Sequence, residues 1–166
     1  MLSEALDVPF HDLAAKTAGA VLLPDDAAYD AARAVWNAMI ARRPVAILQC
    51  KSQEDIVAGV QFAARHGLAV SIKGGGHNVA GHAVGDGSLM LDLSQMRGVI
   101  VDPMARTAWV EGGATWAEVD AAAQALALLR SGGIGHRDAV DRDGAAGWRQ
   151  QADDHPGHRR LARAGL

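Results

Sequence analysis

The residues whose types and spacing could bind a ligand lie between Lys73 and His82, in the sequence KGGGHNVAGH. Three consecutive glycines let backbone N–H groups point together into a concavity, which suits a phosphate or a pyrophosphate. The two common nucleotide signatures do not fit. No G-x-x-x-x-G-K-[ST] is present, and a G-x-G-x-x-G frame from Gly74 would need glycine where Val79 stands. On these residues alone, a turn between two strands remains the more frequent role of an isolated glycine cluster.

Metal and thiol chemistry have less support in the sequence. His77 and His82 are five residues apart without a third ligand, so we predict no metal site and favour surface or hydrogen-bonding roles. Cys50 is the single cysteine, which excludes a disulfide and any site built from several thiolates. It follows an apolar run, where we expect a small buried side chain. The tryptophans expected to pack in the core or at an interface are Trp36, Trp109 and Trp116.

Short apolar runs alternate with helical patterns on both sides of the glycine loop. The predicted strands are 45–48, 69–72, 89–93, 99–102 and 107–110. One helix is predicted from Ser52 to Gly67, with Asp55 three residues after its capping serine. The apolar positions of this helix are Ile56, Val57, Val60 and Ala64. A second helix begins at a capping box of Thr115 and Glu118, followed by an apolar face of Val119, Ala122, Ala123 and Leu126. This order predicts an α+β domain, a mixed sheet with flanking helices, with the loop near its middle.

The overall composition is that of one domain of ordinary size. The 166 residues are 49% hydrophobic and 21% charged, with a net charge of -3. Up to Ile134 there are fourteen acidic and ten basic residues, so we expect no broad basic surface for nucleic acid. Glu4, Asp7 and Asp12 occupy the region where a signal peptide needs a basic start and an apolar run, and no stretch approaches about eighteen uninterrupted apolar residues. We therefore predict a cytoplasmic protein that does not enter a membrane.

Composition divides the chain into three segments. Residues 1–40 are expected to form a helical or extended N-terminal segment, and residues 41–134 the mixed domain. Residues 135–166 contain six Arg and five Asp but few bulky apolar residues, too few to bury a core. We predict a low-complexity tail that is either disordered or the product of a frameshift in a GC-rich gene. An uninterrupted reading frame with no apolar continuation in the alternative frames would exclude the frameshift.

Taken together, several segments of the sequence resemble one family. These segments are RPVAI at 43–47, the helix at 52–67, IKGGGHNVAG at 72–81, LDLSQM at 91–96, VDP at 101–103 and GGATW at 112–116. Their order and spacing resemble the FAD-linked oxidases with a PCMH-type FAD-binding domain, in the group that is similar to berberine-bridge-like enzymes and 6-hydroxy-D-nicotine oxidase. The resemblance spans about residues 20 to 134 and favours the phosphate cradle over the structural turn.

The resemblance implies FAD as cofactor, with its pyrophosphate on the main-chain amides of the loop. The implied cofactor-binding residues are Lys73, Gly74, Gly75, Gly76, His77, Asn78, Val79 and Gly81. His77 matches the histidine that many members link covalently to the flavin 8α-methyl, a role for which a neutral imidazole nitrogen is a suitable nucleophile. Members oxidise a small organic substrate by hydride transfer to the flavin, which molecular oxygen usually reoxidises.

The sequence departs from the family pattern at specific places. Lys73 stands where relatives usually have Arg, which can make a bidentate contact that Lys cannot. Relatives continue after Ile134 with a second flavin-contacting segment, further strands and a substrate domain, whereas the Arg/Asp tail begins here. No catalytic residue is therefore assigned, and Cys50 lies on the wrong side of His77 for a second covalent bond. Without those strands we expect an uncovered sheet that could self-associate.

Three functions remain open at this point. The first is the FAD-binding fragment of a flavin-dependent oxidoreductase, retaining the part of the site around His77. The second is an inactive truncated remnant that binds no cofactor. The third is a small module that uses the loop for another phosphate ligand. The substrate stays unidentified, because the segment that selects it in relatives is not part of this sequence.

Overall fold

The computed structural model describes residues 8–130, and the predicted tail at 135–166 lies outside the described residues. The chain divides into two units, residues 1–127 and residues 128–166. The described part of the second unit is the last turn of one helix. The first unit holds every strand of the described residues and the glycine loop.

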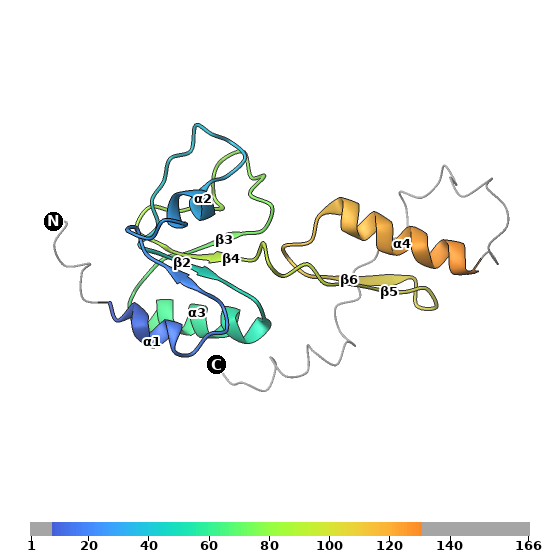
Figure 1. The fold of residues 1–166 in the computed structure, drawn as a ribbon, viewed down its shortest axis with the longest axis horizontal. Coiled ribbons are helices and arrows are strands. Elements are labelled where there is room, and N and C mark those ends of the chain that lie inside the picture. Colours follow the sequence, from blue (N-terminus) through green and yellow to red (C-terminus); the bar gives the residue numbers. More distant parts are fainter. Residues whose placement is uncertain (1–7, 131–166) are drawn as a thin grey trace. The chain divides into compact units, whose positions relative to one another are not determined.

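A four-stranded mixed sheet carries the first unit, with the strand order β1-β2-β4-β3 (Figure 1). The strands are β1 (Val21–Leu22), β2 (Ala46–Gln49), β3 (Val70–Lys73) and β4 (Leu89–Asp92). β4 pairs in parallel with both β2 and β3, and β1 pairs antiparallel with β2. Residues from the N-terminal segment thus belong to the same sheet as the mixed domain. Every residue of β4 is buried, as expected for a central parallel strand covered on both faces.

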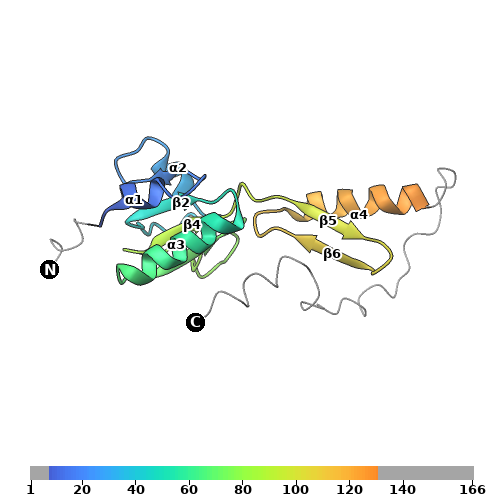
Figure 2. The ribbon, with the colours of Figure 1, turned by 90° about the horizontal axis from the view of Figure 1, so that it is seen from below.

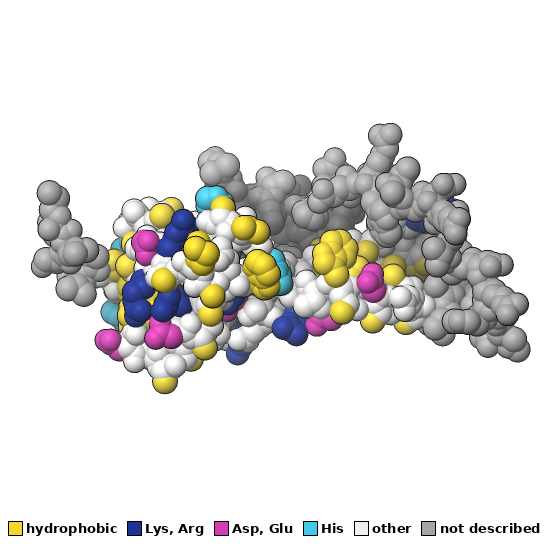
Figure 3. Space-filling model, turned by 90° about the horizontal axis from the view of Figure 1, so that it is seen from above, with side chains coloured by type: hydrophobic (Ala, Val, Ile, Leu, Met, Phe, Trp, Pro, Cys, Tyr) yellow, Lys and Arg dark blue, Asp and Glu magenta, His cyan; other side chains and the backbone are white. Residues whose placement is uncertain are grey.

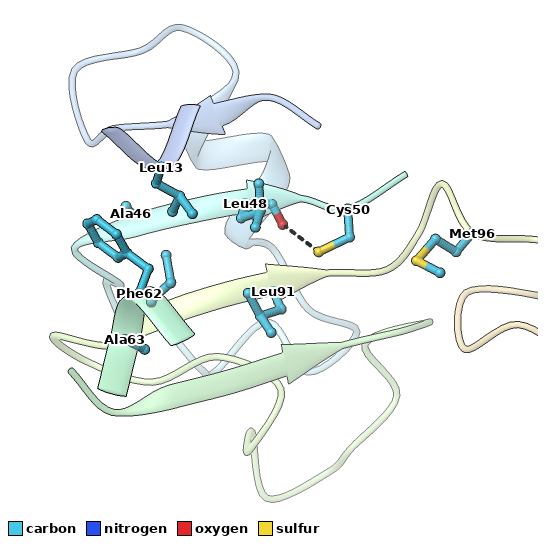
Figure 4. Close-up of a cluster of buried hydrophobic side chains, with 9 residues drawn as sticks. Leu13, Ala46, Leu48, Cys50, Phe62, Ala63, Leu91 and Met96 are labelled. Atoms are coloured by element: carbon cyan, nitrogen blue, oxygen red, sulfur yellow. Dashed lines mark hydrogen bonds between the residues drawn. The ribbon is translucent and has the colours of Figure 1, made fainter. Parts of the chain in front are cut away.

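Helices cover the two faces of this sheet, and alternate residues of β2 and β4 point to opposite sides. On one face lie α1 (Phe10–Ala14) and α3 (Gln53–Arg65), which Figure 2 shows from below. Their buried side chains pack with alternate strand residues in one cluster, most of which is drawn in Figure 4: Leu13, Phe62, Ala63, Ala46, Leu48, Leu89 and Leu91. On the other face, α2 (Tyr29–Arg33) buries Tyr29 and Ala32 against Ile47 and Met90.

α3 begins where the sequence predicts, but it buries a different face. Ser52 is the N-cap, and its hydroxyl accepts a 3.4 Å hydrogen bond from the backbone N–H of Asp55. The carboxylate of Asp55 is buried and accepts 2.8 Å hydrogen bonds from the backbone N–H groups of Ala18 and Lys51. It thereby ties the start of the helix to the N-terminal segment.

The buried face of α3 is set by close approach to the sheet. Of the predicted apolar positions, Val57 and Val60 are 38% and 45% exposed and Ala64 is exposed, so the prediction was wrong for these three. The helix instead buries Asp55, Gly59, Phe62 and Ala63. A Cβ at Gly59 would lie 2.7 Å from a methyl of Leu91, so the glycine lets the helix backbone approach the sheet.

A hairpin and a helix follow the sheet. β5 (Val99–Asp102) and β6 (Thr107–Val110) pair antiparallel, and α4 spans Trp116–Arg130. The predicted capping box is present, because the Thr115 N–H donates to Oε2 of Glu118 at 2.7 Å and the Glu118 N–H donates to the Thr115 hydroxyl at 3.4 Å. No helix within residues 8–130 combines the length and hydropathy of a membrane span.

The glycine loop that follows β3 and the glycine pair Gly112–Gly113 that follows β6 meet at the end of the sheet. A Cβ built on Gly74 would lie 2.4 Å from the backbone oxygen of Gly112, and one on Gly113 would lie 1.8 Å from the backbone oxygen of Leu93. The Gly113 N–H donates to the Met96 oxygen at 3.0 Å. Backbone therefore packs on backbone here, and a side chain at either position would push the segments apart.

Cys50 offers a test of the core. The thiol is fully buried, and desolvation, followed by the charges of Asp55 and Asp92, raises the pKa of Cys50 to about 12. An unfolded cysteine has a pKa of about 8.5, so alkylation by iodoacetamide at pH 8.5 should be roughly a thousandfold slower in the native chain than in urea. Equal rates in the two conditions would show that the core is not formed.

The same pKa shift predicts a pH dependence of stability. Because the pKa of Cys50 is higher in the folded than in the unfolded chain, its stabilising contribution is complete below about pH 8.5 and is lost as the pH rises toward 12. Urea unfolding should show the free energy of unfolding of the wild type falling between pH 8.5 and 10. In Cys50→Ala the free energy of unfolding should fall less steeply over the same pH range. Equal slopes in the wild type and the variant would contradict the prediction.

The glycine contact predicts unequal effects of two neighbouring substitutions. Gly74→Ala places a methyl group against a backbone oxygen and should lower the free energy of unfolding by about 1–3 kcal/mol. Gly75→Ala meets only the movable His77 ring and should stay within about 0.5 kcal/mol of wild type. Urea unfolding measures both, with Cys50 alkylation as a second readout if Gly74→Ala does not fold. Equal stability of the two variants would contradict the contact.

Candidate functional site

The candidate site is the loop that leaves the carboxyl end of β3, from Gly74 to His82. Its start is fixed by the sheet, because the Leu93 N–H donates to the Lys73 oxygen at 2.8 Å at the end of the β3–β4 pairing. The crevice beyond the carboxyl ends of parallel strands is the usual ligand position in open sheets of this kind. The loop therefore lies at the edge of the sheet where ligands usually bind.

The amides of this loop form the feature that could hold an anion. Among the described residues, no acceptor takes the backbone N–H of any residue from 74 to 80, whereas the Gly81 N–H donates to the Asn78 oxygen at 3.0 Å. Gly76 and Gly81 have φ values of 70° and 74°, a conformation that favours glycine. A run of unpaired N–H groups shaped by glycines fits a phosphate or pyrophosphate.

The side chains of Lys73, just before the loop, and Asn78, in its middle, make hydrogen bonds that support the loop. The ammonium of Lys73 donates to the backbone oxygen of Ala32, at the end of α2, at 2.5 Å. An ammonium has three donors, so this bond leaves capacity for an anion. The Asn78 side-chain oxygen accepts from the His82 N–H at 3.1 Å, which closes the far turn.

His77 lies exposed on the loop beside an aromatic ring. The centroids of the His77 and Trp36 rings are 6.4 Å apart and tilted by 40°. Trp36 is 69% exposed and Trp116 is 82% exposed, so of the two expected roles, core or interface, neither side chain packs in the core. Trp109 is partly buried. Figure 3 shows hydrophobic, basic and histidine side chains exposed together on the side of the sheet that carries α2. No sequence pattern indicated that Trp36 would lie beside a loop about forty residues away.

The structure separates the other candidate residues. His82 lies exposed at the far end of the loop, and no group of three or more His, Cys, Asp or Glu within residues 8–130 could hold a metal ion. Cys50 is buried in the core, where its thiol donates to the Leu48 oxygen at 3.6 Å (Figure 4). The expectation of a small buried side chain is confirmed.

Comparison with known proteins identifies what this geometry is similar to. A family model described as an FAD binding domain matches residues 44–134. The chain is 37% identical over 95 residues to (R)-6-hydroxynicotine oxidase of Paenarthrobacter nicotinovorans, a match that covers 57% of this chain and 21% of that protein. It is 36% identical over 112 residues to glucooligosaccharide oxidase of Sarocladium strictum, covering 66% of this chain and 20% of that protein.

A solved structure of a related oxidase is also similar to this chain. The crystal structure of 6-hydroxy-D-nicotine oxidase from Arthrobacter nicotinovorans superposes with a TM-score of 0.62 and 34% sequence identity, covering 65% of this chain and 24% of that one. The chain thus spans about a fifth of the length of the curated relatives named above. More than half of its residues lie within the family match and its sheet and helices follow the same fold, so the chain belongs to the FAD binding domain family and carries the first part of the PCMH-type FAD-binding domain of FAD-linked oxidoreductases.

Proposed function

We propose that the loop from Lys73 to Gly81 binds the pyrophosphate of FAD, and that the chain is the N-terminal part of a flavin-dependent oxidoreductase. The observation that carries this proposal is the run of backbone N–H groups from 74 to 80 that have no acceptor among the described residues. Two phosphate groups carry several oxygens that need donors, and unpaired amides supply them without a side chain in the way. The ammonium of Lys73 adds one positive charge at the start of the loop.

His77 is the residue through which the chain would hold the flavin covalently. Its imidazole is exposed, stands within the run of unpaired amides and lies beside the ring of Trp36. These features leave a ring nitrogen accessible to a bound group, which is what attachment requires. When bound, FAD supplies the redox chemistry by taking a hydride from a small organic substrate and passing the electrons to oxygen.

The loop residues would bind and orient the cofactor, and no substrate site is assigned within residues 8–130. The oxidase activity, its substrate and its use of oxygen therefore belong to a larger site, in keeping with the fifth of the relatives' length that the chain spans. β3 lies at the edge of the sheet with Val70 and Ile72 39% and 55% exposed, which supports self-association or cover by further protein at this edge.

The test is the colour of the protein. The full 166-residue chain is expressed, purified and precipitated with acid, and flavin absorbance is measured in the pellet and in the supernatant. We expect flavin to stay in the wild-type pellet and to be absent from the His77→Ala pellet, because the variant removes the attaching nitrogen. His82→Ala is the matched control, since it removes an exposed imidazole from the same loop, and its pellet should keep the flavin.

Other outcomes would overturn separate parts of the proposal. Flavin bound to the native wild type but released by acid would remove the covalent role of His77 and keep FAD binding. A wild type that stays colourless with added FAD but binds inorganic pyrophosphate would favour a general phosphate-binding module. A chain that binds neither would be a remnant without a cofactor.

A further inference from the structure

A segment upstream of the family match lies against the glycine loop. Residues 36–42 follow α2, outside the matched range of 44–134, yet they make repeated contacts with residues 76–84. The backbone N–H of Trp36 donates to the Gly76 oxygen at 3.0 Å. A Cβ on Gly81 would lie 2.8 Å from carbons of Ile40, so the loop backbone rests directly on this segment.

Two polar side chains of the segment fix the loop. Asn37 donates from Nδ2 to the Val79 oxygen at 3.0 Å, while its own Oδ1 accepts from the Met39 N–H at 3.1 Å. Arg42 donates from Nη1 to the Gly81 oxygen at 2.8 Å and to the Val84 oxygen at 3.3 Å. The two bonds of Arg42 are partly buried, which shields them from competing water, whereas the bonds of Asn37 are exposed.

All of these hydrogen bonds engage the same kind of loop group. The oxygens of Gly76, Val79, Gly81 and Val84 accept from residues 36–42, whereas within the described residues no acceptor of that segment takes a loop N–H. In a trans peptide the C=O and the following N–H point in opposite directions. Holding the oxygens of Gly76 and Val79 therefore directs the N–H groups of His77 and Ala80 away from the segment.

We infer that residues 36–42 are the positioning element of the cofactor loop, with Asn37 and Arg42 as positioning residues. Their donors hold the loop oxygens on one side, so that the N–H groups of residues 77 and 80 face the anion. This inference rests on the proposed function for the identity of the anion. The positioning itself is a property of the free chain and can be measured without FAD.

The experiment compares matched pairs of variants. Arg42→Ala is paired with Arg43→Ala, which removes the same charge from the next residue, where the guanidinium contacts Asp30 at 3.5 Å and lies over Tyr29. Asn37→Ala is paired with Met39→Ala, which truncates the 90% exposed side chain of Met39 two residues further on. Cys50 alkylation verifies that each variant is folded.

The first readout is amide hydrogen exchange in the absence of ligand, followed in peptides that contain the bonded N–H groups of Gly81, His82 and Val84. Arg42→Ala and Asn37→Ala keep these N–H bonds but remove donors to the neighbouring loop oxygens. The turns are then held less firmly, and exchange there is expected to speed up by about fivefold. The second readout is the FAD concentration that half-saturates the apoprotein, from quenching of flavin fluorescence, which should rise by about fivefold in both variants. Both controls should stay within about twofold of wild type on both readouts, and Arg42→Lys should recover part of the loss.

Each alternative outcome decides the inference. Unchanged exchange in folded Arg42→Ala and Asn37→Ala overturns it, even where FAD binding weakens. A weaker salt dependence of FAD binding in Arg42→Ala, with unchanged exchange, would assign Arg42 to direct contact with the phosphates instead. If the wild type takes up no FAD, the proposed function fails, and the exchange measurement alone decides whether residues 36–42 position the loop.

Discussion

β4 is paired on both sides, in parallel, with strands that arrive from distant parts of the chain. β2 ends at Gln49 opposite Asp92, and β3 ends at Lys73 opposite the same residue, so both strands stop at one level. That common level fixes where the glycine loop leaves the sheet. It also fixes where the chain leaves β4 at Leu93, which contacts Gly112 and Gly113. A slip by one residue would exchange the two faces of β4, moving Leu89 and Leu91 out of the cluster with α1 and α3 and Met90 out of the cluster with α2.

In the glycine loop the oxygens of Gly76, Asn78, Val79 and Gly81 accept hydrogen bonds, whereas the N–H groups of residues 74–80 have no acceptor among the described residues. Protein folds rarely leave backbone donors without a partner, since an unmade hydrogen bond costs free energy. Gly75 and residues 77–80 are exposed, so their N–H groups can donate to water and avoid most of that cost. An anion that replaces this water gains preset donors with little ordering of the chain.

The parts of the fold that follow local rules could be predicted from the sequence. The apolar runs at 46–48 and 89–91 and the capping residues Ser52 and Thr115 carry their own signals, and the structure has strands and helices at these places. Contacts between distant segments could not be predicted. The buried face of α3 depends on Gly59 meeting Leu91, and the position of Trp36 involves contacts with Gly76 and His77, about forty residues later. β1 has two residues and α1 and α2 have five each, too few to show a periodic pattern. The glycine loop could be located from its residue types, but those residues alone favoured a structural turn, and the resemblance of the surrounding segments to a family was needed to favour a ligand.

The sheet also has a consequence for the order in which the protein forms during synthesis. All four of its strands and the three helices that cover it lie before Leu93, although their pairings join residues far apart in the sequence. Parallel pairings of this kind form late relative to local helices, because a long connection must close first. Here every connection is complete once residue 93 has left the ribosome, while the hairpin and α4 are still to come. The sheet, α2 and the 36–42 segment can therefore assemble around the glycine loop as one early unit, onto which later-synthesised protein is added.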